Sequence, residues 1–515
     1  METPIPLDAR LAWLRRFRDA VRTHHPELCA LASEEVGKPV FEAMVADVMP
    51  LIAACNWHLG RGSRLLRPRR VRGGGLFGLG HTVERHRMPV GRVLIIATWN
   101  YPVQLLGIQL VQAVLAGNSV VVKPSERAPR TQARLLALAI DALSAGGRDG
   151  MHGLADAGII EVRSASRDEG RRVLAEERFD HVVFTGSTAV GRAIAEVCAS
   201  RLVPSTLELS GSDSAIVLAD ADARAAARAV FMGVTGNAGQ TCMAPRRALV
   251  AREALAAFSD ELARLVAGAK RLTLVDAAAA QTAHGVAARA IAAGGRSIAG
   301  ALEPCAGRAM RPVAVLDCPV DSDLFHGRHF GPAIAVRAFD TLDEAFALHA
   351  TVGQYLATSI WTRRPRADLA ARMHACGSSL VHFNSVLLPS AHPAVSIGGH
   401  GASGWGVSRG ESGLRALTRE VTVTRTSRFL SVPAEEPSSR VQRVLSRFIA
   451  WPGRAHSVTA PSAAAAPSAA AAPGPVTAPS SSASSHPAPN NAGERQPSSP
   501  DRPQPHQPTR TEVHA

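Results

Sequence analysis

The chain has 515 residues, of which 46% are hydrophobic, and a formal net charge of +14 at neutral pH. From about Ser457 onward it consists mainly of alanine, proline and serine. These residues bring too little apolar side-chain area to offset the entropy of ordering, which excludes a packed domain there and predicts a disordered tail over 457–515. The number of residues before this tail exceeds what one hydrophobic core usually supports, so we expect two or more packed units with a binding cleft between them.

The positive charge does not form a pattern typical of nucleic-acid binding. Lysine occurs only at positions 38, 123 and 270, so arginine supplies nearly all of the charge. The arginines are scattered along amphipathic stretches without stacking aromatic residues or helix-turn-helix spacing, which argues against a nucleic-acid partner. The seven cysteines are odd in number and form no CxxC pair. Together with the absence of a signal-peptide pattern or a run of about 18 apolar residues, they predict a reduced, cytoplasmic setting.

The first part of the chain is predicted to be helical. Apolar side chains recur at helical spacing between residues 7 and 60. Glycines at 73–80 end this pattern, and the polar stretch HTVERHRMP that follows is expected to form an exposed strand.

From Gly91 onward, short apolar runs alternate with amphipathic helices. Strands are predicted at 91–98, 118–126, 159–163 and 181–186, and helices at 104–115 and 131–143. A second series begins near Ser205 and includes the strand-like runs RALVA, VAVLD, AIAVRAF and LATSIWT. This alternation predicts an α/β fold with parallel sheets and helices on both faces, in which ligands bind at the carboxyl ends of the strands.

A short basic amphipathic helix is predicted between residues 440 and 454. Its apolar positions recur at helical spacing, with arginines between them: Val441, Val444, Leu445, Phe448 and Trp451. Such a helix either makes a weak contact with an anionic membrane surface or packs on its own protein.

Two loops next to predicted strands suggest ligand binding. FTGSTAVG places Gly186 and Gly191 directly after a strand and at the start of a helix, where free backbone N–H groups suit an anion such as a pyrophosphate. An ordinary strand-to-helix turn has the same pattern. In TWNYP, Asn100 either caps the following helix or donates to a developing oxyanion.

Two further motifs carry reactive side chains. GNAGQTCMAP places Cys242 after a glycine-containing loop. There a thiol is either an inert core residue or a nucleophile whose thiolate is favoured by backbone dipoles. LELSG holds Glu208 inside an apolar strand. Because burying a carboxylate costs several kcal/mol unless it is paired or protonated, this glutamate has either a structural partner or a catalytic role.

Together these motifs resemble the aldehyde dehydrogenase superfamily, and within it the class 3 branch of fatty and aromatic aldehyde dehydrogenases. The resemblance covers about Leu7 to Thr424. It rests on IIATWNYP, VVVKPSE, ERFDHVVFTGSTAVGR, TLELSG, GQTCMAP, FGP at 330–332 and SIGGHGASGWG. The spacing of Glu208 and Cys242 also agrees with that family.

The resemblance implies a role for each motif residue. Cys242 would attack an aldehyde to form a thiohemiacetal and then a thioester, while the Asn100 amide and the Cys242 backbone N–H hold the oxyanion. Glu208 would act as general base for the water that hydrolyses the thioester. The implied cofactor is NAD or NADP, with no metal. Lys123 and Glu126 would meet the adenosine ribose, and Gly186, Ser187 and Gly191 the pyrophosphate; Thr188, Trp99 and Phe330 would complete the cofactor site.

The resemblance also implies a domain organisation. A Rossmann-like coenzyme domain would span 1–207, with a bridging segment at about 80–90, and an α/β catalytic domain would span 208–395. Residues 396–430 would return to the coenzyme domain and add a bridging strand near Val421, and 431–456 would form a linker and the basic helix. The unpaired edge of the bridging region predicts a homodimer.

Three features depart from the family pattern. Arg328 stands two positions before FGP, where the family has an acid that grips the nicotinamide ribose; a guanidinium has no acceptor, so this contact is lost or remade. LELSGSD has Ser210 and Ser212 in place of a glycine and a lysine, which narrows the cofactor channel. Residues 266–300 lack the usual specificity loops, so no motif indicates which aldehyde is used.

Two other classes of function stay open. One is a cofactor-impaired, non-catalytic relative that acts as a binding protein, which Arg328 favours. The other is a coenzyme A-acylating aldehyde dehydrogenase or acyl reductase, and Glu208 argues against it because a general base favours water as the acceptor.

Overall fold

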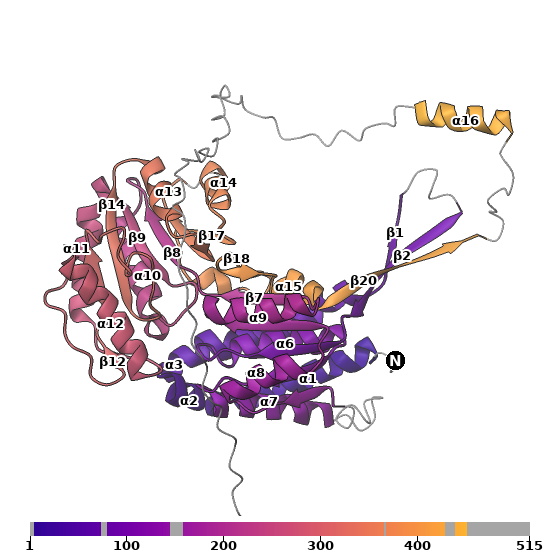
Figure 1. The fold of residues 1–515 in the computed structure, drawn as a ribbon, viewed down its shortest axis with the longest axis horizontal. Coiled ribbons are helices and arrows are strands. Elements are labelled where there is room, and N and C mark those ends of the chain that lie inside the picture. The colour runs from indigo at the N-terminus through magenta and orange to yellow at the C-terminus, as the bar shows by residue number, and fades with distance from the viewer. Residues whose placement is uncertain (1–4, 74–79, 145–157, 365–366, 428–437, 451–515) are drawn as a thin grey trace, which may run out of the picture. The chain divides into compact units, whose positions relative to one another are not determined.

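The computed structural model describes residues 5–73, 80–144, 158–364, 367–427 and 438–450. The chain divides into two compact units, Met1–Ser431 and Val432–Ala515. The first contains two largely parallel sheets with helices on both faces, so the predicted α/β class is confirmed (Figure 1). The predicted tail, 457–515, lies outside the described residues.

A six-stranded sheet forms one lobe of the first unit, in the order β19-β7-β6-β3-β4-β5. All neighbours are parallel except β19 and β7. The strands are β3 (Arg92–Ile96), β4 (Ser119–Lys123), β5 (Ile160–Val162), β6 (His181–Gly186), β7 (Ser205–Leu209) and β19 (Gly404–Trp405). The predicted strands are therefore present, and the expected division between residues 207 and 208 falls inside β7.

Side chains alternate between the two faces of this sheet, as the strand period requires. On β3, Val93 and Ile95 belong to one buried cluster, whereas Leu94 belongs to another. The first face is covered by α1 (Leu7–Thr23), α2 (His25–Val36), α4 (Met49–Trp57), α6 (Gln104–Ala116) and α7 (Pro129–Ser144). The second face is covered by α8 (Arg167–Glu176) and α9 (Thr188–Ser200).

A seven-stranded sheet forms the second lobe, in the order β11-β13-β14-β9-β8-β16-β17. Its strands are β8 (Asp213–Val217), β9 (Pro245–Ala251), β11 (Arg296–Ser297), β13 (Val313–Leu316), β14 (Ala333–Phe339), β16 (Ala357–Trp361) and β17 (Leu380–Phe383). One face packs against α10 (Ala223–Thr235) and α11 (Arg252–Gly268), and the other against α12 (Ala277–Ala292), α13 (Leu342–Ala350) and α14 (Ala367–Ala375). Two short pairs lie beside it: β10 (Leu272–Thr273) with β12 (Ala309–Met310), and β15 (Gln354–Tyr355) with β18 (His400–Gly401).

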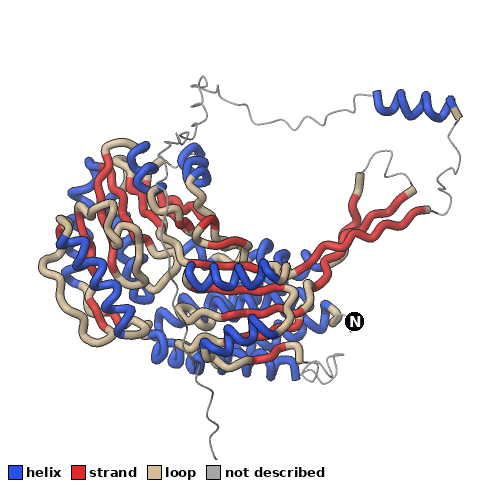
Figure 2. The backbone as a smooth tube through the Cα atoms, in the orientation of Figure 1, coloured by secondary structure: helices blue, strands red, loops and turns tan. Residues whose placement is uncertain are grey.

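A three-stranded ribbon extends beyond the helices of the first unit (Figure 2). It consists of β1 (Arg69–Val71), β2 (His81–Pro89) and β20 (Thr418–Thr426). The two long strands are antiparallel and pair along their whole length, from His81 opposite Thr426 to Pro89 opposite Thr418. The polar stretch HTVERHRMP and the strand around Val421 therefore lie side by side, with β20 at an edge, and α15 (Gly410–Ala416) precedes β20.

An interrupted helix over Val40–Leu66 crosses the first lobe. It consists of α3 (Val40–Ala43), a π-helical turn η1 (Met44–Val48), α4, a second π-helical turn η2 (His58–Gly62) and α5 (Ser63–Leu66). By length and hydropathy alone it is the one helix among the described residues that could cross a membrane. Leu51 and Cys55, however, are fully buried in the core cluster of the lobe, as in the core helix of a globular domain.

The described part of the second unit is a single helix, α16 (Ser439–Ala450). It coincides with most of the predicted basic helix, of which Trp451 and the residues after it lie outside the described residues. Val444 is 64% exposed and Ile449 is 84% exposed.

Candidate active site

The loops that follow β3 and β6 meet at the point where the strand order of the six-stranded sheet reverses. β4 and β5 lie on one side of β3, and β6 and β7 on the other. Crevices of this kind, at the carboxyl ends of parallel strands, are where open α/β sheets bind ligands. Trp99 and Asn100 follow β3, and Ser187 follows β6, so the structure brings these predicted residues to one edge.

The first turn of α9 fits the expected pyrophosphate site. The Ser187 hydroxyl accepts a hydrogen bond from the Val190 backbone N–H (3.4 Å). The first backbone N–H groups of a helix have no partner inside it and favour an anion. Gly191 allows α9 to pack tightly, because a Cβ there would lie 2.4 Å from Leu209. The Thr188 hydroxyl donates to the Ala402 carbonyl (3.0 Å) and ties the turn to the loop before β19.

Lys123 and Glu126 form an ion pair at the end of β4, with 3.4 Å between Nζ and Oε2. The Lys123 side chain is buried, and burial lowers its pKa while Glu126 opposes this effect. Arg167 donates to the other carboxylate oxygen of Glu126 (2.7 Å). The pair thus lies on the same edge of the sheet as the α9 turn.

Trp99 and Phe330 meet across the two lobes. Their rings pack edge to face, with centroids 5.8 Å apart. The Arg127 guanidinium lies 5.4 Å from the Trp99 ring and that of Arg246 lies 5.3 Å from the Phe330 ring. The FGP segment is thereby held against the loop after β3.

Asn100 is held against the loop that carries Cys242. Its side-chain Nδ2 donates to the Gln240 carbonyl (3.0 Å), and its own carbonyl accepts from Asn237 Nδ2 (2.8 Å). The next residue, Tyr101, shares a hydrogen bond of 2.6 Å with the Thr241 hydroxyl. Asn100 does not cap α6, which begins at Gln104, so the capping alternative is excluded.

The loop before Cys242 is strained and tightly packed. Asn237 and Ala238 lie in η4 (Gly236–Gly239) with φ angles of 50° and 53°, a left-handed conformation that costs free energy for residues other than glycine. Gly239 adjoins the FGP segment, because a Cβ there would lie 2.5 Å from the Gly331 backbone. Arg246 is buried and donates to the carbonyls of Gly239 (3.1 Å) and Thr241 (3.0 Å). Such strain persists only where the surroundings enforce it, as at active sites.

Cys242 is half-buried, and its carbonyl accepts a hydrogen bond from the Gly211 N–H (3.2 Å), just beyond β7. Burial and the negative charge of Glu208 raise the pKa of its thiol to about 11, although Arg409 and Arg246 act in the opposite direction. In the free protein this shift opposes the alternative in which backbone dipoles favour the thiolate. Desolvation outweighs them, and the thiol is neutral at pH 7.

Glu208 lies on β7 opposite Thr185 of β6. Its carboxylate accepts a hydrogen bond from the Ser408 hydroxyl, and the Thr185 hydroxyl lies 3.5 Å from its other oxygen. Burial raises the pKa of Glu208, while Ser408 and the buried Arg409 guanidinium lower it. Two hydroxyl groups thus hold the glutamate, which agrees with the structural-partner alternative, and its charge acts on the Cys242 thiol. Its catalytic role stays a prediction.

Several residues around this centre did not emerge from the sequence: Lys38, Asp47, Thr185, Ser408 and Arg409. Thr185 lies inside the FTGSTAVG motif, and Ser408 and Arg409 lie two and three residues after the SIGGHGASGWG motif, so these motifs were the available signals. Lys38 lies between α2 and α3 and Asp47 lies in η1, in a part of the chain where helical spacing gives no indication of a catalytic neighbour.

Arg328, the predicted departure, points to the surface. Its Nη1 donates to Asp323 (3.0 Å), the side chain is 70% exposed, and Arg289 binds the other oxygen of the same carboxylate (3.1 Å). Ser212 is buried and donates to the His326 carbonyl (3.0 Å).

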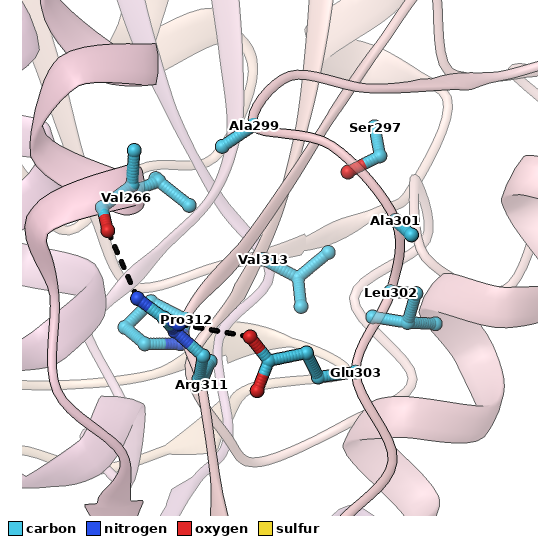
Figure 3. Close-up of a pocket in the computed structure, with 10 residues that line it drawn as sticks. Val266, Ser297, Ala299, Ala301, Leu302, Glu303, Arg311, Pro312 and Val313 are labelled. Atoms are coloured by element: carbon cyan, nitrogen blue, oxygen red, sulfur yellow. Dashed lines mark hydrogen bonds and ion pairs between the residues drawn. The ribbon is translucent and has the colours of Figure 1, made fainter.

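The hollow in Figure 3 is separate from this centre. It has a volume of about 140 Å³ and lies between the end of α11 and the segment Ser297–Val313. Arg311 crosses it and donates to Glu303 (2.8 Å). None of the predicted site residues lines it, so it is not the candidate active site.

The raised pKa predicts how Cys242 reacts with alkylating agents. Only the thiolate is nucleophilic, so the rate of alkylation by iodoacetamide without cofactor should rise about tenfold per pH unit from pH 7 to 10, below the pKa of about 11. Peptide mass spectrometry of the Cys242 peptide measures this rate, and Cys242→Ala gives the background from other cysteines. A plateau below pH 8 would contradict the raised pKa.

Comparisons with known proteins show the family of this chain. Residues 3–423 match the model of the aldehyde dehydrogenase family. A benzaldehyde dehydrogenase [NAD(+)] of Pseudomonas putida is 32% identical over 68% of this chain and 71% of its own length. A putative succinate-semialdehyde dehydrogenase [NADP(+)] of Mycolicibacterium smegmatis is 29% identical over 83% of this chain and 82% of its own.

Among solved structures, an oxidoreductase from Marinobacter aquaeolei superposes with a TM-score of 0.73 at 25% identity, covering 82% of this chain and 87% of that one. The family model spans most of the chain and includes every residue of the centre described above. The chain therefore belongs to the aldehyde dehydrogenase family, whose enzymes oxidise aldehydes with NAD or NADP.

Proposed function

We propose that this protein oxidises an aldehyde to a carboxylic acid by covalent catalysis through Cys242 and hydrolysis through Glu208. The observation that carries the proposal is the meeting of a half-buried thiol, a buried carboxylate and the Asn100 amide around one loop. Cys242 attacks the carbonyl carbon, and its own backbone N–H and the Asn100 side chain hold the developing oxyanion. The thiol proton passes to solvent or to Glu208 as the C–S bond forms.

The residues present fit a nicotinamide dinucleotide. The turn at Gly186–Gly191 would hold the pyrophosphate, and Lys123 and Glu126 the adenosine ribose; Trp99 and Phe330 would flank the nicotinamide end. When bound, this cofactor accepts a hydride from the substrate carbon. The proposed cofactor is NAD or NADP, since one of the two relatives described above is named for NAD and the other for NADP.

Glu208 acts next, as the base that removes a proton from the water attacking the thioester. A base is most effective when its pKa lies near the working pH, and burial moves the pKa of Glu208 in that direction. The Ser408 hydroxyl orients the carboxylate and Thr185 supports it from the neighbouring strand. Water, rather than coenzyme A, is therefore the proposed acceptor.

The test is a panel of aldehydes with NAD and with NADP, followed by the absorbance of the reduced cofactor. Benzaldehyde, medium-chain aldehydes and succinate semialdehyde cover the chemistry in the names of the two relatives. We expect stoichiometric acid and reduced cofactor without coenzyme A. A requirement for coenzyme A would favour the acylating alternative, and binding of cofactor without turnover of any aldehyde would favour a non-catalytic binding protein.

Arg328 is predicted to weaken cofactor binding. The family's acid at this position would accept hydrogen bonds from ribose hydroxyls, and hydrogen bonds to a charged group contribute about 1.5–3 kcal/mol. Arg328→Glu should therefore tighten cofactor binding about tenfold, measured by titration calorimetry. The exposed pair with Asp323 contributes little, so Arg328→Ala serves as the matched control. If Arg328→Glu binds no more tightly than Arg328→Ala, the ribose is held by other groups.

We propose that the protein forms a homodimer through the ribbon of β1, β2 and β20. β20 lies at an edge of this sheet and is mostly exposed, which leaves backbone groups available to a second copy.

We propose a cytoplasmic location for the protein. All seven cysteines are free thiols, which is typical of proteins in a reducing compartment.

We propose a weak membrane-surface contact through α16. On a helical wheel its exposed apolar residues form one face, and Arg440, Arg443 and Arg447 lie together on one flank. Vesicles containing phosphatidylserine should carry the intact chain in flotation. Two variants should stay at the bottom of the gradient: a chain ending at Val432, and the full-length triple variant Arg440→Gln/Arg443→Gln/Arg447→Gln. Equal flotation of all three would refute the contact.

A further inference from the structure

A buried ion pair beneath the Asn100 loop has no part in the mechanism above. Lys38 follows Gly37, which caps the end of α2 with a φ of +92°, and Asp47 lies in the π-helical turn η1. Lys38 Nζ and Asp47 Oδ2 are 2.6 Å apart, and both side chains are inaccessible to solvent. A buried pair of this kind is weak evidence for stability, because its desolvation cost often equals its attraction. π-helical turns inside α-helices are frequent at functional sites.

The pair holds both ends of the loop that carries Asn100. Lys38 Nζ donates to the Asn100 backbone carbonyl (2.7 Å), and the same ammonium lies 4.1 Å from the centre of the Tyr101 ring. Asp47 Oδ1 accepts from the backbone N–H groups of Val103 (3.2 Å) and Gln104 (3.0 Å). Asp47 thereby caps α6 with a negative charge, the sign that a helix N-terminus favours.

The same loop is joined to the Cys242 loop on its other side. The Asn100 carbonyl accepts a second hydrogen bond, from Asn237 Nδ2, and the Asn100 amide donates to Gln240. Since two donors fix the plane of the Asn100–Tyr101 peptide, they also fix the direction in which the Asn100 side chain leaves the backbone. A displacement of about 1 Å in a group that positions reacting atoms can reduce a rate about 100-fold.

We propose that Lys38, neutralised by Asp47, is a positioning residue for the first chemical step: it holds the Asn100 carbonyl so that the Asn100 amide reaches the oxyanion. This inference rests on the proposed role of Asn100. Lys38 acts through Asn100 and touches neither the aldehyde nor the cofactor. Removing it should lower the rate of acylation and hydride release while leaving cofactor binding unchanged.

The test compares wild type, Lys38→Met, Lys38→Met/Asp47→Asn and Asn100→Ala. The readouts are the rate constant of the pre-steady-state burst of reduced cofactor, the KM for aldehyde, the Kd for cofactor and the melting temperature. Lys38→Met leaves Asp47 buried without its counter-charge, so both the melting temperature and the burst rate should fall. In the double variant, the uncharged amide introduced by Asp47→Asn still accepts from the α6 N-terminus through its oxygen, so the melting temperature should recover.

A positioning role and a purely structural role of Lys38 predict different results for the double variant. For a positioning residue, the burst rate stays at least tenfold below wild type although the melting temperature recovers, because the Asn100 carbonyl keeps the Asn237 donor but still lacks the Lys38 donor. Cofactor Kd should remain within about twofold in every variant. Recovery of the burst together with the melting temperature would show a purely structural pair and overturn the proposal.

Two controls complete the design. Each burst rate is divided by the fraction of Cys242 that iodoacetamide can alkylate, which corrects for misfolded protein. A wild-type rate per reactive Cys242 in either Lys38 variant would overturn the proposal even if folding is impaired. Asn100→Ala distinguishes the proposed oxyanion role of Asn100 from the proposed positioning role of Lys38. If its burst equals wild type, the oxyanion role in the proposed function fails; if its burst is slow while that of Lys38→Met is normal, only the positioning role fails.

Discussion

Replacing Cys242 with alanine should abolish aldehyde oxidation, lowering kcat/KM by about 10⁴-fold or more, because no other group can form the covalent intermediate. The Cys242 side chain is half-buried and alanine retains its Cβ, so folding and cofactor binding should be nearly unchanged. The measurement is steady-state formation of reduced cofactor with the best aldehyde of the panel, together with a cofactor titration.

Cys305→Ala is the matched control for this variant. Cys305 is also a half-buried free thiol, but it lies in the loop between β11 and β12, away from the Asn100 and Gly211 contacts of Cys242. This control should retain wild-type activity. Substantial turnover by Cys242→Ala would contradict covalent catalysis at this position.

Replacing Glu208 with glutamine should separate the two halves of the reaction. Glutamine keeps the size of the side chain and a carbonyl that can accept from Ser408, but it cannot remove a proton from water. Loss of a general base typically costs about 10²–10⁴-fold, so turnover should fall by that factor while one equivalent of reduced cofactor still appears rapidly. The burst should be undiminished because removing the negative charge of Glu208 lowers the pKa of the Cys242 thiol.

Stopped-flow absorbance measures both phases of this experiment. The control is Glu261→Gln, a change at another buried glutamate, which pairs with Arg228 of α10 and Arg264 of α11; it should leave both phases intact. Absence of the burst in Glu208→Gln would assign Glu208 to activation of the thiol instead of hydrolysis.

The sheets were predictable because their strands are continuous apolar runs bounded by glycine, proline or polar loops. GRVLIIAT, NSVVVKPSE and HVVFTG became β3, β4 and β6, and the helices after them began within a few residues of the expected positions. In a doubly wound sheet this pattern also predicts which loops share an edge, and Trp99, Asn100 and Ser187 lie there accordingly.

The environment of the reactive groups was not predictable in the same way. The Cys242 pKa depends on burial and on the charge of Glu208, and both are set by the packing of distant segments. Lys38 reaches Asn100 from 62 residues away, and Ser408 reaches Glu208 from 200 residues away. Helical or strand periodicity encodes which face of an element is apolar, but it carries no information on which polar group of another element lies opposite.

Mass spectrometry of the intact protein and its peptides tests the central claim most directly. Glu208→Gln, mixed with the best aldehyde of the panel and oxidised cofactor and quenched in acid within the burst, should carry one acyl group derived from that aldehyde, and the adduct should map to the peptide that contains Cys242. An unmodified protein after a full burst, or an acyl group on any other residue, would contradict a thioester at Cys242.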